Sequence, residues 1–224
     1  MAYLSDSDHR IVTDAVAEAE LQTSGEIVTV LADRSDGYSD VAFAWAILAA
    51  FLTLTLCAIF PDFVLDTYAG LHGGWNTRWS PSEIFSMATG AAIFWFLIIG
   101  LLQLIPPIKF AMIPGRIKTD RAHARAIALF KVGAERRTHG RTGVLIYLSM
   151  REHRAEIIAD EPIAAKVPAE VWGEAMADML VEIKQGRIAE GMAAGVRDVG
   201  EILSEHFPRA DDDRNELPDR LIEV

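Results

Sequence analysis

Two long apolar runs interrupt a chain that is otherwise rich in charged, mainly acidic, residues. The run from Ala42 to Phe60 has no ionisable side chain except Cys57, and the run from Phe85 to Ile105 has no charged residue. As helices that rise ~1.5 Å per residue, they would be roughly 28–32 Å long, about the thickness of the hydrocarbon core of a bilayer. We therefore predict a transmembrane hairpin over residues 41–106. The alternative is a pair of buried core helices, which are usually shorter and keep a polar stripe.

The residues before the hairpin follow first a helical and then a strand pattern. Ser5 and Asp8 have the spacing of a capping box, and apolar residues recur at helical spacing behind them, which predicts a helix over residues 6–22. The β-branched run Glu26–Ala32 predicts a strand that is buried on both faces. A polar turn, residues 33–38, then leads into the first apolar run.

Beyond the hairpin, the same periodicities predict a helix, two strands and two further helices, at 120–137, 142–149, 155–160, 168–185 and 188–207. Only four polar residues separate the two strands, so they should be antiparallel. The first strand of the chain and the strand at 142–149 are joined through a helix and should be parallel. The predicted fold class is α/β, a small mixed sheet sandwiched by helices. Residues 1–40 and 107–208 would form one discontinuous domain, and residues 209–224 an acidic tail.

Charge and cysteine content exclude several classes of protein. The formal net charge of the 224 residues is −11, and no basic stripe is present to neutralise phosphates, so nucleic acid is not an expected partner. The charge also argues against attachment to the lipid bilayer through a polybasic surface, which leaves the hairpin as the anchor. Cys57 is the single cysteine, so neither an intrachain disulfide nor a thiolate metal cluster can form.

The orientation of the hairpin follows from the positive charges that flank it. The connecting segment, residues 61–84, holds one basic residue, Arg78. The stretch after the second run is richer in them, with Lys109, Arg116, Lys118, Arg121 and Arg125. Because short loops poor in Lys and Arg are the ones translocated, we expect both termini in the cytoplasm. The N-terminus has acids where a signal peptide has a basic region, so the first apolar run would itself direct the chain to the membrane.

Acidic residues that follow predicted strands are the candidate metal ligands. Asp33 and Asp36 follow the first strand, and Asp160 follows the third. Ligands of open α/β sheets collect at the carboxyl ends of strands, and calcium or magnesium would require several carboxylate oxygens. The alternative is that these side chains are solvated or cap helices, because an antiparallel third strand can end at the opposite edge of the sheet.

Other motifs with known chemistry are incomplete or absent. The pattern Asp211-x-Asp213-x-Asn215 lacks the glycine and the final glutamate of a calcium EF-loop and is interpreted as a solvated tail. No P-loop, HExxH or GxSxG sequence is present, and the histidines have no ligand-like spacing. Whether the chain is an enzyme therefore stays open.

Four segments together carry a family resemblance. They are SGEIVTVLAD (24–33), RTGVLIYLSMREHRAEIIADEPIAAKVP (141–168), the helix that begins VWGEAM at Val171, and GRIAEGMAAGVRDVGEIL (186–203). They resemble the TPM domain, in particular the branch of bacterial membrane proteins in which a hydrophobic hairpin is inserted into that domain. The resemblance implies an α/β/α fold in a multi-pass protein of the bacterial inner membrane. Relatives have been described as acid phosphatases, calcium binders, or accessory proteins in photosystem maintenance or receptor regulation.

The chain departs from the pattern of the family at two places. Many relatives carry Asn-Asp-Tyr before the first helix, where this chain has Ser5-Asp6-Ser7-Asp8. Many have a glycine-rich turn after the third strand, where this chain has Asp160-Glu161-Pro162. We therefore expect an accessory role in the cell envelope, with a protein partner that the sequence does not identify. The alternative is a metal-assisted acid phosphatase, or a domain that binds a divalent cation, using Asp33, Asp36 and Asp160.

Overall fold

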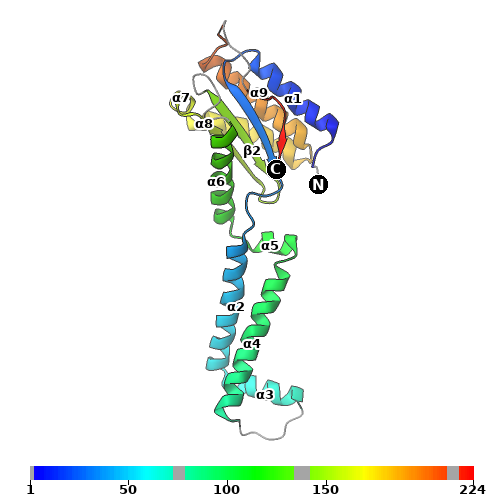
Figure 1. Cartoon of the computed structure of the whole chain (residues 1–224), viewed down its shortest axis with the longest axis vertical. Coiled ribbons are helices and arrows are strands. Elements are labelled where there is room, and N and C mark those ends of the chain that lie inside the picture. Colours follow the sequence, from blue (N-terminus) through cyan, green and yellow to red (C-terminus); the bar gives the residue numbers. More distant parts are fainter. Residues whose placement is uncertain (1–2, 73–78, 134–141, 211–216) are drawn as a thin grey trace. The chain divides into compact units, whose positions relative to one another are not determined.

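The computed structural model describes residues 3–72, 79–133, 142–210 and 217–224. The chain forms two compact units. One combines Met1–Asp36 with Gly115–Val224 and contains the sheet, and the other is Gly37–Pro114 and contains the hairpin. Figure 1 shows the elements of each unit, which are described separately below.

The sheet has four strands in the order β3-β2-β1-β4. They are β1 (Glu26–Ala32), β2 (Gly143–Ser149), β3 (Arg154–Ala159) and β4 (Ile222–Glu223). β1 and β2 are parallel, with Glu26 opposite Gly143, whereas β2 and β3 are antiparallel. The α/β class, the first three strands and both strand directions predicted from the sequence are thus confirmed.

The end of the chain differs from the acidic tail expected for residues 209–224. Ile222 and Glu223 pair with β1 as a parallel edge strand. The amide of Val224 donates to the carbonyl of Leu31, and the carbonyl of Val224 accepts from the amide of Asp33, both at 3.0 Å. Leu217 and Leu221 are buried, so apolar contacts return this acidic segment to the domain. The pattern at 211–215 lies outside the described residues.

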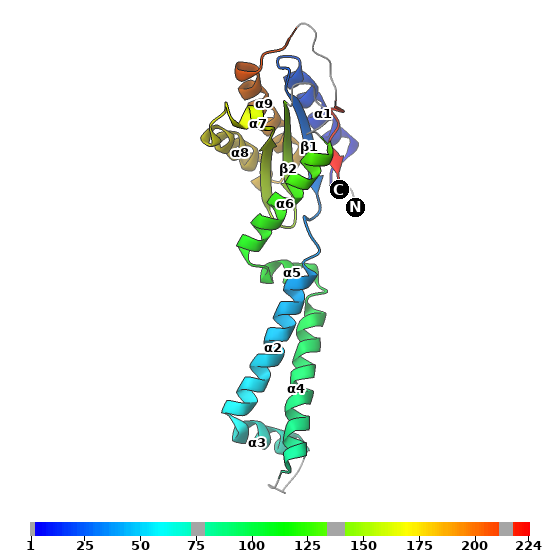
Figure 2. The ribbon, with the colours of Figure 1, turned by 60° about the vertical axis from the view of Figure 1, so that its left-hand side comes forward.

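Helices cover both faces of the sheet, as Figure 2 shows. On one face lie α1 (Asp6–Glu20), α8 (Ala169–Lys184) and α9 (Ile188–His206), and on the other lies α6 (Gly115–Gly133). Alternate residues of β1 serve the two layers, since Ile27 and Leu31 pack with the first group and Val28 and Val30 pack with α6. The short helix α7 (Glu161–Ala164) follows β3. The arrangement is the predicted α/β/α sandwich.

Two helix starts show how local sequence sets the boundaries. The predicted capping box is present at Ser5 and Asp8, and α1 begins directly after it. The helix expected from residue 120 begins earlier, at Gly115, because Pro114 ends the preceding segment and permits a helix to start behind it.

The second unit is a helical hairpin. Its long helices are α2 (Ser39–Ile59) and α4 (Pro81–Leu102), which pack against each other, and α5 (Pro106–Met112) follows them. α4 begins four residues before the predicted position because Ser80 and Glu83 form a capping box in front of the apolar run. The connecting segment, expected to be a loop, contains a further helix, α3 (Pro61–His72).

Polar and aromatic contacts close the open end of the hairpin. The indole of Trp45 donates to the carbonyl of Met112, and the amide of Gln103 donates to the carbonyl of Ala42, each at 3.0 Å. The rings of Tyr38 and Phe110 meet edge to face with centroids 5.7 Å apart. The chain therefore enters and leaves this unit at one end.

Candidate functional site

The carboxyl end of β1 carries the first predicted ligand, Asp33, which is held by two side chains of its own unit. The Nε of Arg151 donates to both carboxylate oxygens, at 2.9 and 3.0 Å, and the hydroxyl of Tyr3 also donates to Oδ1. The Tyr3 hydrogen bond and the Arg151 guanidinium together hold the pKa of Asp33 below its ordinary value. Asp33 is therefore an anchored carboxylate that stays charged at neutral pH.

Beside Asp33 lies a buried carboxylate that the sequence analysis missed. Glu152 is 1% exposed and accepts the backbone amide of Ser35 at 2.8 Å and the hydroxyl of Ser149. The Ser35 hydroxyl also bonds to the hydroxyl of Tyr147 at 2.9 Å, and burial raises the pKa of that tyrosine, so it stays protonated. Glu152 thus connects the segment that follows β1 with the last residue of β2. In the sequence it looked like part of a polar turn.

Asp36, the second predicted ligand, binds α6. Its carboxylate forms an ion pair with Arg121, and both side chains are about one-third exposed. Asp33 and Asp36 therefore each have a cationic partner from the chain itself, Arg151 in one case and Arg121 in the other.

Asp160, the third predicted ligand, lies at the opposite end of the sheet. It is 2% exposed and accepts the amide of Gly143, the first residue of β2, at 3.0 Å. The start of β2 lies beside the start of β1, whereas Asp33 follows the end of β1. Six steps of about 3.3 Å put the two ends of that strand roughly 20 Å apart. The expectation of one metal site from Asp33, Asp36 and Asp160 is therefore wrong, because β3 runs antiparallel to β2.

Two more buried carboxylates occur at that far end. Glu20 accepts the amide of Ile27 at 2.9 Å, and Glu26 accepts the amide of Leu217 at 3.1 Å. Both border a shallow pocket of about 190 Å³, which Arg209 also lines. Glu20 thus satisfies an amide of β1 outside the two residues that pair with β4, and Glu26 holds the segment that leads to β4. Within the described parts of the chain, no group of three or more His, Cys, Asp or Glu is placed to hold a metal ion.

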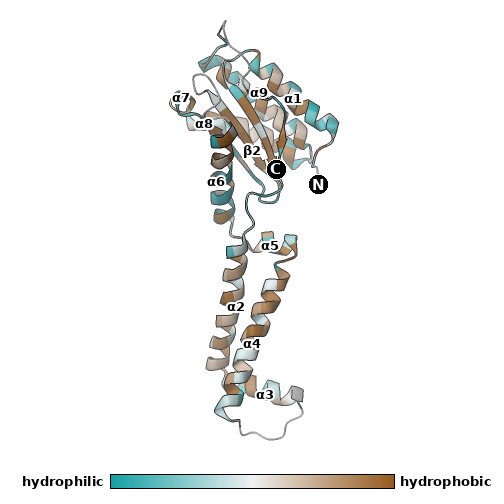
Figure 3. Cartoon of the chain, viewed as in Figure 1, coloured by the Kyte–Doolittle hydropathy of each residue, from teal (hydrophilic) through white to brown (hydrophobic). Residues whose placement is uncertain are grey.

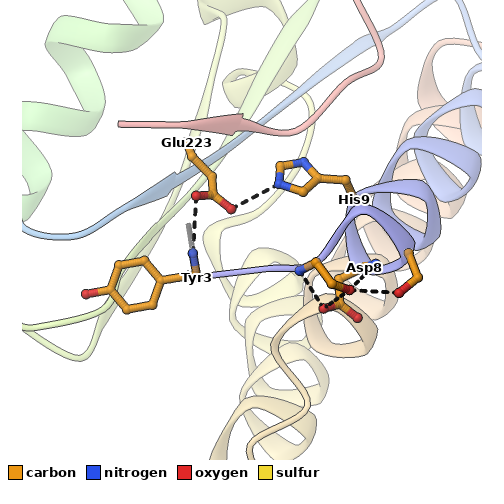
Figure 4. A network of polar contacts seen from close by, with 6 residues as sticks. Tyr3, Asp8, His9 and Glu223 are labelled. Carbon is orange, nitrogen blue, oxygen red and sulfur yellow. Dashed lines mark hydrogen bonds and ion pairs between the residues drawn. The ribbon is translucent and has the colours of Figure 1, made fainter. Parts of the chain in front are cut away.

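A third polar network ties the two ends of the chain together (Figure 4). The carboxylate of Glu223, in β4, accepts the amide of Tyr3 at 3.3 Å and bonds to Nε2 of His9 at 3.0 Å. Tyr3 also reaches Asp33, so the segment before α1 connects β4 with the carboxyl end of β1. The arrangement at this edge can hold segments in place and present a surface. Its named carboxylates already accept donors from the chain.

The comparisons with known proteins agree with this architecture. The family model of the TPM domain matches residues 110–202, which covers α6, β2, β3, α7, α8 and most of α9. The NMR structure of the BA42 protein from the psychrophilic bacterium Bizionia argentinensis is similar over 100% of this chain and 97% of its own, with a TM-score of 0.57. At 17% identity that likeness shows the fold alone. No curated protein matches the chain. Residues 110–202 thus match the TPM domain, as the sequence resemblance predicted, and β1, which precedes the hairpin, pairs with β2 of the matched segment.

Proposed function

We propose that this chain is an integral protein of the bacterial inner membrane whose cytoplasmic TPM domain binds a protein partner in an accessory role in the envelope. The observation that carries the membrane anchor is the surface of α2 and α4. They have 21 and 22 residues, and the most apolar 18 residues of each have mean hydropathies of 2.3 and 2.1, yet only 6% of these stretches is buried. At ~1.5 Å per residue they are roughly 32 and 33 Å long, enough to cross the hydrocarbon core.

The outward side chains of this hairpin favour lipid over water. Phe43 and Phe51 are 63% and 64% exposed, and much of the remaining surface of both helices is also aromatic or aliphatic. Figure 3 shows hydrophobic colouring along both helices. The core helix of a water-soluble protein would be mostly buried, and monomeric soluble proteins rarely expose so large an apolar patch. A bilayer supplies the apolar surroundings that these side chains need.

The far end of the hairpin has the composition of a membrane interface. Tyr68 of α3 and Trp79 pack edge to face with ring centroids 5.6 Å apart. Such amphipathic rings concentrate at the level of lipid headgroups. Asp62 and Asp66, one helical turn apart on α3, are exposed. The connecting segment holds one basic residue, Arg78, whereas several basic residues follow the hairpin, and this difference supports an orientation in which both termini are cytoplasmic.

A binding role fits the domain better than hydrolysis does. The phosphatase expected as an alternative required Asp33 and Asp160 in one site, and these residues lie at opposite ends of the sheet. The carboxylates at each end accept hydrogen bonds from the chain's own backbone or side chains. These polar groups order loops and strand ends, so we infer that the domain acts through its surface.

The single cysteine permits a direct test of the anchor and its orientation. In a Cys57→Ser background, Thr67→Cys places a thiol on the exposed side of α3, and Ala210→Cys places one in the sheet domain. A membrane-impermeant maleimide should label the first in intact cells and the second only after permeabilisation. Release of the protein by alkaline carbonate would contradict the anchor, and the reverse labelling pattern would contradict the orientation.

The partner role requires a separate experiment. Crosslinking in intact cells, followed by purification in detergent, should recover one protein in a constant ratio to this chain. A control that expresses the hairpin with a fused unrelated soluble domain should not recover it. If the full chain consistently purifies without a crosslinked protein, the binding role is wrong even where the anchor is correct.

A further inference from the structure

The net charge of the chain conceals a basic helix directly behind the hairpin. α6 contains five Lys or Arg and one Asp, a formal charge of +4, in a chain whose total is −11. The remaining residues therefore carry −15. Such a separation of charge is not needed for the fold, because α6 packs on the sheet through the apolar side chains of Ala122, Ala126 and Phe130.

The basic residues lie around the outward face of α6. Arg116, Arg125 and Lys131 are exposed, and Lys118 is partly exposed. Arg121 lies on the same side but is engaged by Asp36. Between these charges runs a ridge of small apolar side chains at a spacing of four residues, Ala124, Ala128 and Val132, all exposed, and the exposed Asp120 precedes them in the same row as the one acid of α6. The small side chains of this ridge leave the longer Lys and Arg side chains free to reach an anionic surface, and anionic lipid attracts basic residues that lie near it.

The covalent connection keeps α6 near the bilayer if the hairpin spans it. Thirteen positions separate Leu102, the end of α4, from Gly115, and seven of the residues between them form α5. A helical rise of ~1.5 Å and an extended rise of ~3.5 Å per residue limit this connection to roughly 30 Å. α6 itself is about as long as that, and membranes attract basic residues that lie close behind a spanning helix.

We infer that the outward face of α6 binds the anionic phospholipid headgroups of the cytoplasmic leaflet. This inference rests on the proposed membrane anchor and extends it, because the domain would then meet the membrane through its own surface as well as through the hairpin. The acidic remainder of the domain would be repelled by the same leaflet, which would orient α6 toward it.

The test uses the full chain in lipid nanodiscs, with a nitroxide on Ala128→Cys in a Cys57→Ser background. Contact of the label with a nickel-chelating lipid should be higher in discs that contain phosphatidylglycerol than in pure phosphatidylcholine, and should fall in high salt. Each basic side chain near an anionic surface changes the ratio of lipid-bound to free domain by roughly fivefold. The double variant Arg125→Gln with Lys131→Gln should therefore lower this ratio by roughly 30-fold. A label on Ala177→Cys, on exposed α8, should show none of these changes.

A matched charge control separates this surface from a general effect of net charge. Lys184→Gln with Arg197→Gln removes two exposed cations from α8 and α9. If this variant loses as much contact as the α6 variant, or if the Ala128 label contacts both lipid compositions equally, the inference is wrong. Release of the parent protein by alkaline carbonate would instead contradict the membrane anchor itself.

Discussion

The buried carboxylate of Glu152 gives the sharpest test of how the domain holds the segment that leads to the hairpin. Glu152→Ala removes the acceptor of two donors, the backbone amide of the half-buried Ser35 and the hydroxyl of the buried Ser149. Leaving a buried donor unsatisfied costs ~1–3 kcal/mol, and the Ser149 hydroxyl can rotate toward another acceptor while the amide cannot. Part of this loss is offset because a buried charge is removed. We expect a net loss of about 2 kcal/mol in the free energy of unfolding.

Thermal unfolding in detergent, followed by near-ultraviolet circular dichroism, measures this loss. For a domain of about 150 residues, ~1 kcal/mol corresponds to roughly 2–4 °C, so Tm should fall by roughly 4–8 °C. Glu152→Gln keeps an oxygen that can accept from the amide of Ser35 and should lose less than half as much. Glu174→Ala, on the exposed side of α8, should change the stability by no more than ~0.5 kcal/mol.

Amide hydrogen exchange locates the effect within the domain. The Ser35 amide should be protected in the parent protein and should exchange faster in Glu152→Ala, with little change in the middle of β2. If Glu152→Ala and Glu174→Ala unfold at the same temperature, the hydrogen bonds of Glu152 do not stabilise the domain. If the Ser35 amide exchanges freely in the parent protein, the exit segment is not fixed as described.

Three further outcomes are expected. The Tyr3 hydroxyl and Arg151 lower the pKa of Asp33 in the folded protein. The stability that these contacts add is therefore complete above about pH 4 and is lost as the pH falls through the lowered pKa. The difference in Tm between the parent protein and Asp33→Asn should shrink between pH 7 and pH 3. Gly191→Ala should destabilise the domain by ~1–3 kcal/mol, because the new Cβ would lie 2.8 Å from a backbone oxygen of α8. Gly173→Ala, where the new Cβ would meet open space, should be neutral or slightly stabilising in the same thermal unfolding experiments. Titration with calcium or magnesium should leave Tm unchanged, and a rise in Tm would contradict the assignment of the strand-end carboxylates to internal contacts.

The accuracy of the sequence predictions depended on how local the determining interactions are. The β-branched run Glu26–Ala32 became a strand with those same bounds, because a segment buried on both faces favours apolar and β-branched side chains at most positions. The three-layer arrangement followed from the order of the elements. β4 was missed because two paired residues leave no periodicity, although Leu221 and Ile222 were its available apolar signal. The burial of Glu152 depends on the approach of Ser35, 117 residues away in sequence, and no local pattern reports that contact.

The position of the hairpin within the domain has a simple energetic explanation. β1 is a central strand, and its partner β2 lies 117 residues further along the chain. Closing so long a connection would be slow and entropically costly if the whole of it were flexible. The hairpin, however, closes on itself, with the side chain of Gln103 bonded to the carbonyl of Ala42. The flexible connection is thereby about halved, which saves roughly 0.6 kcal/mol of loop-closure free energy. For the sheet, an insertion whose ends already meet behaves like a shorter loop, so the hairpin can be placed directly after a central strand without separating that strand from its partner.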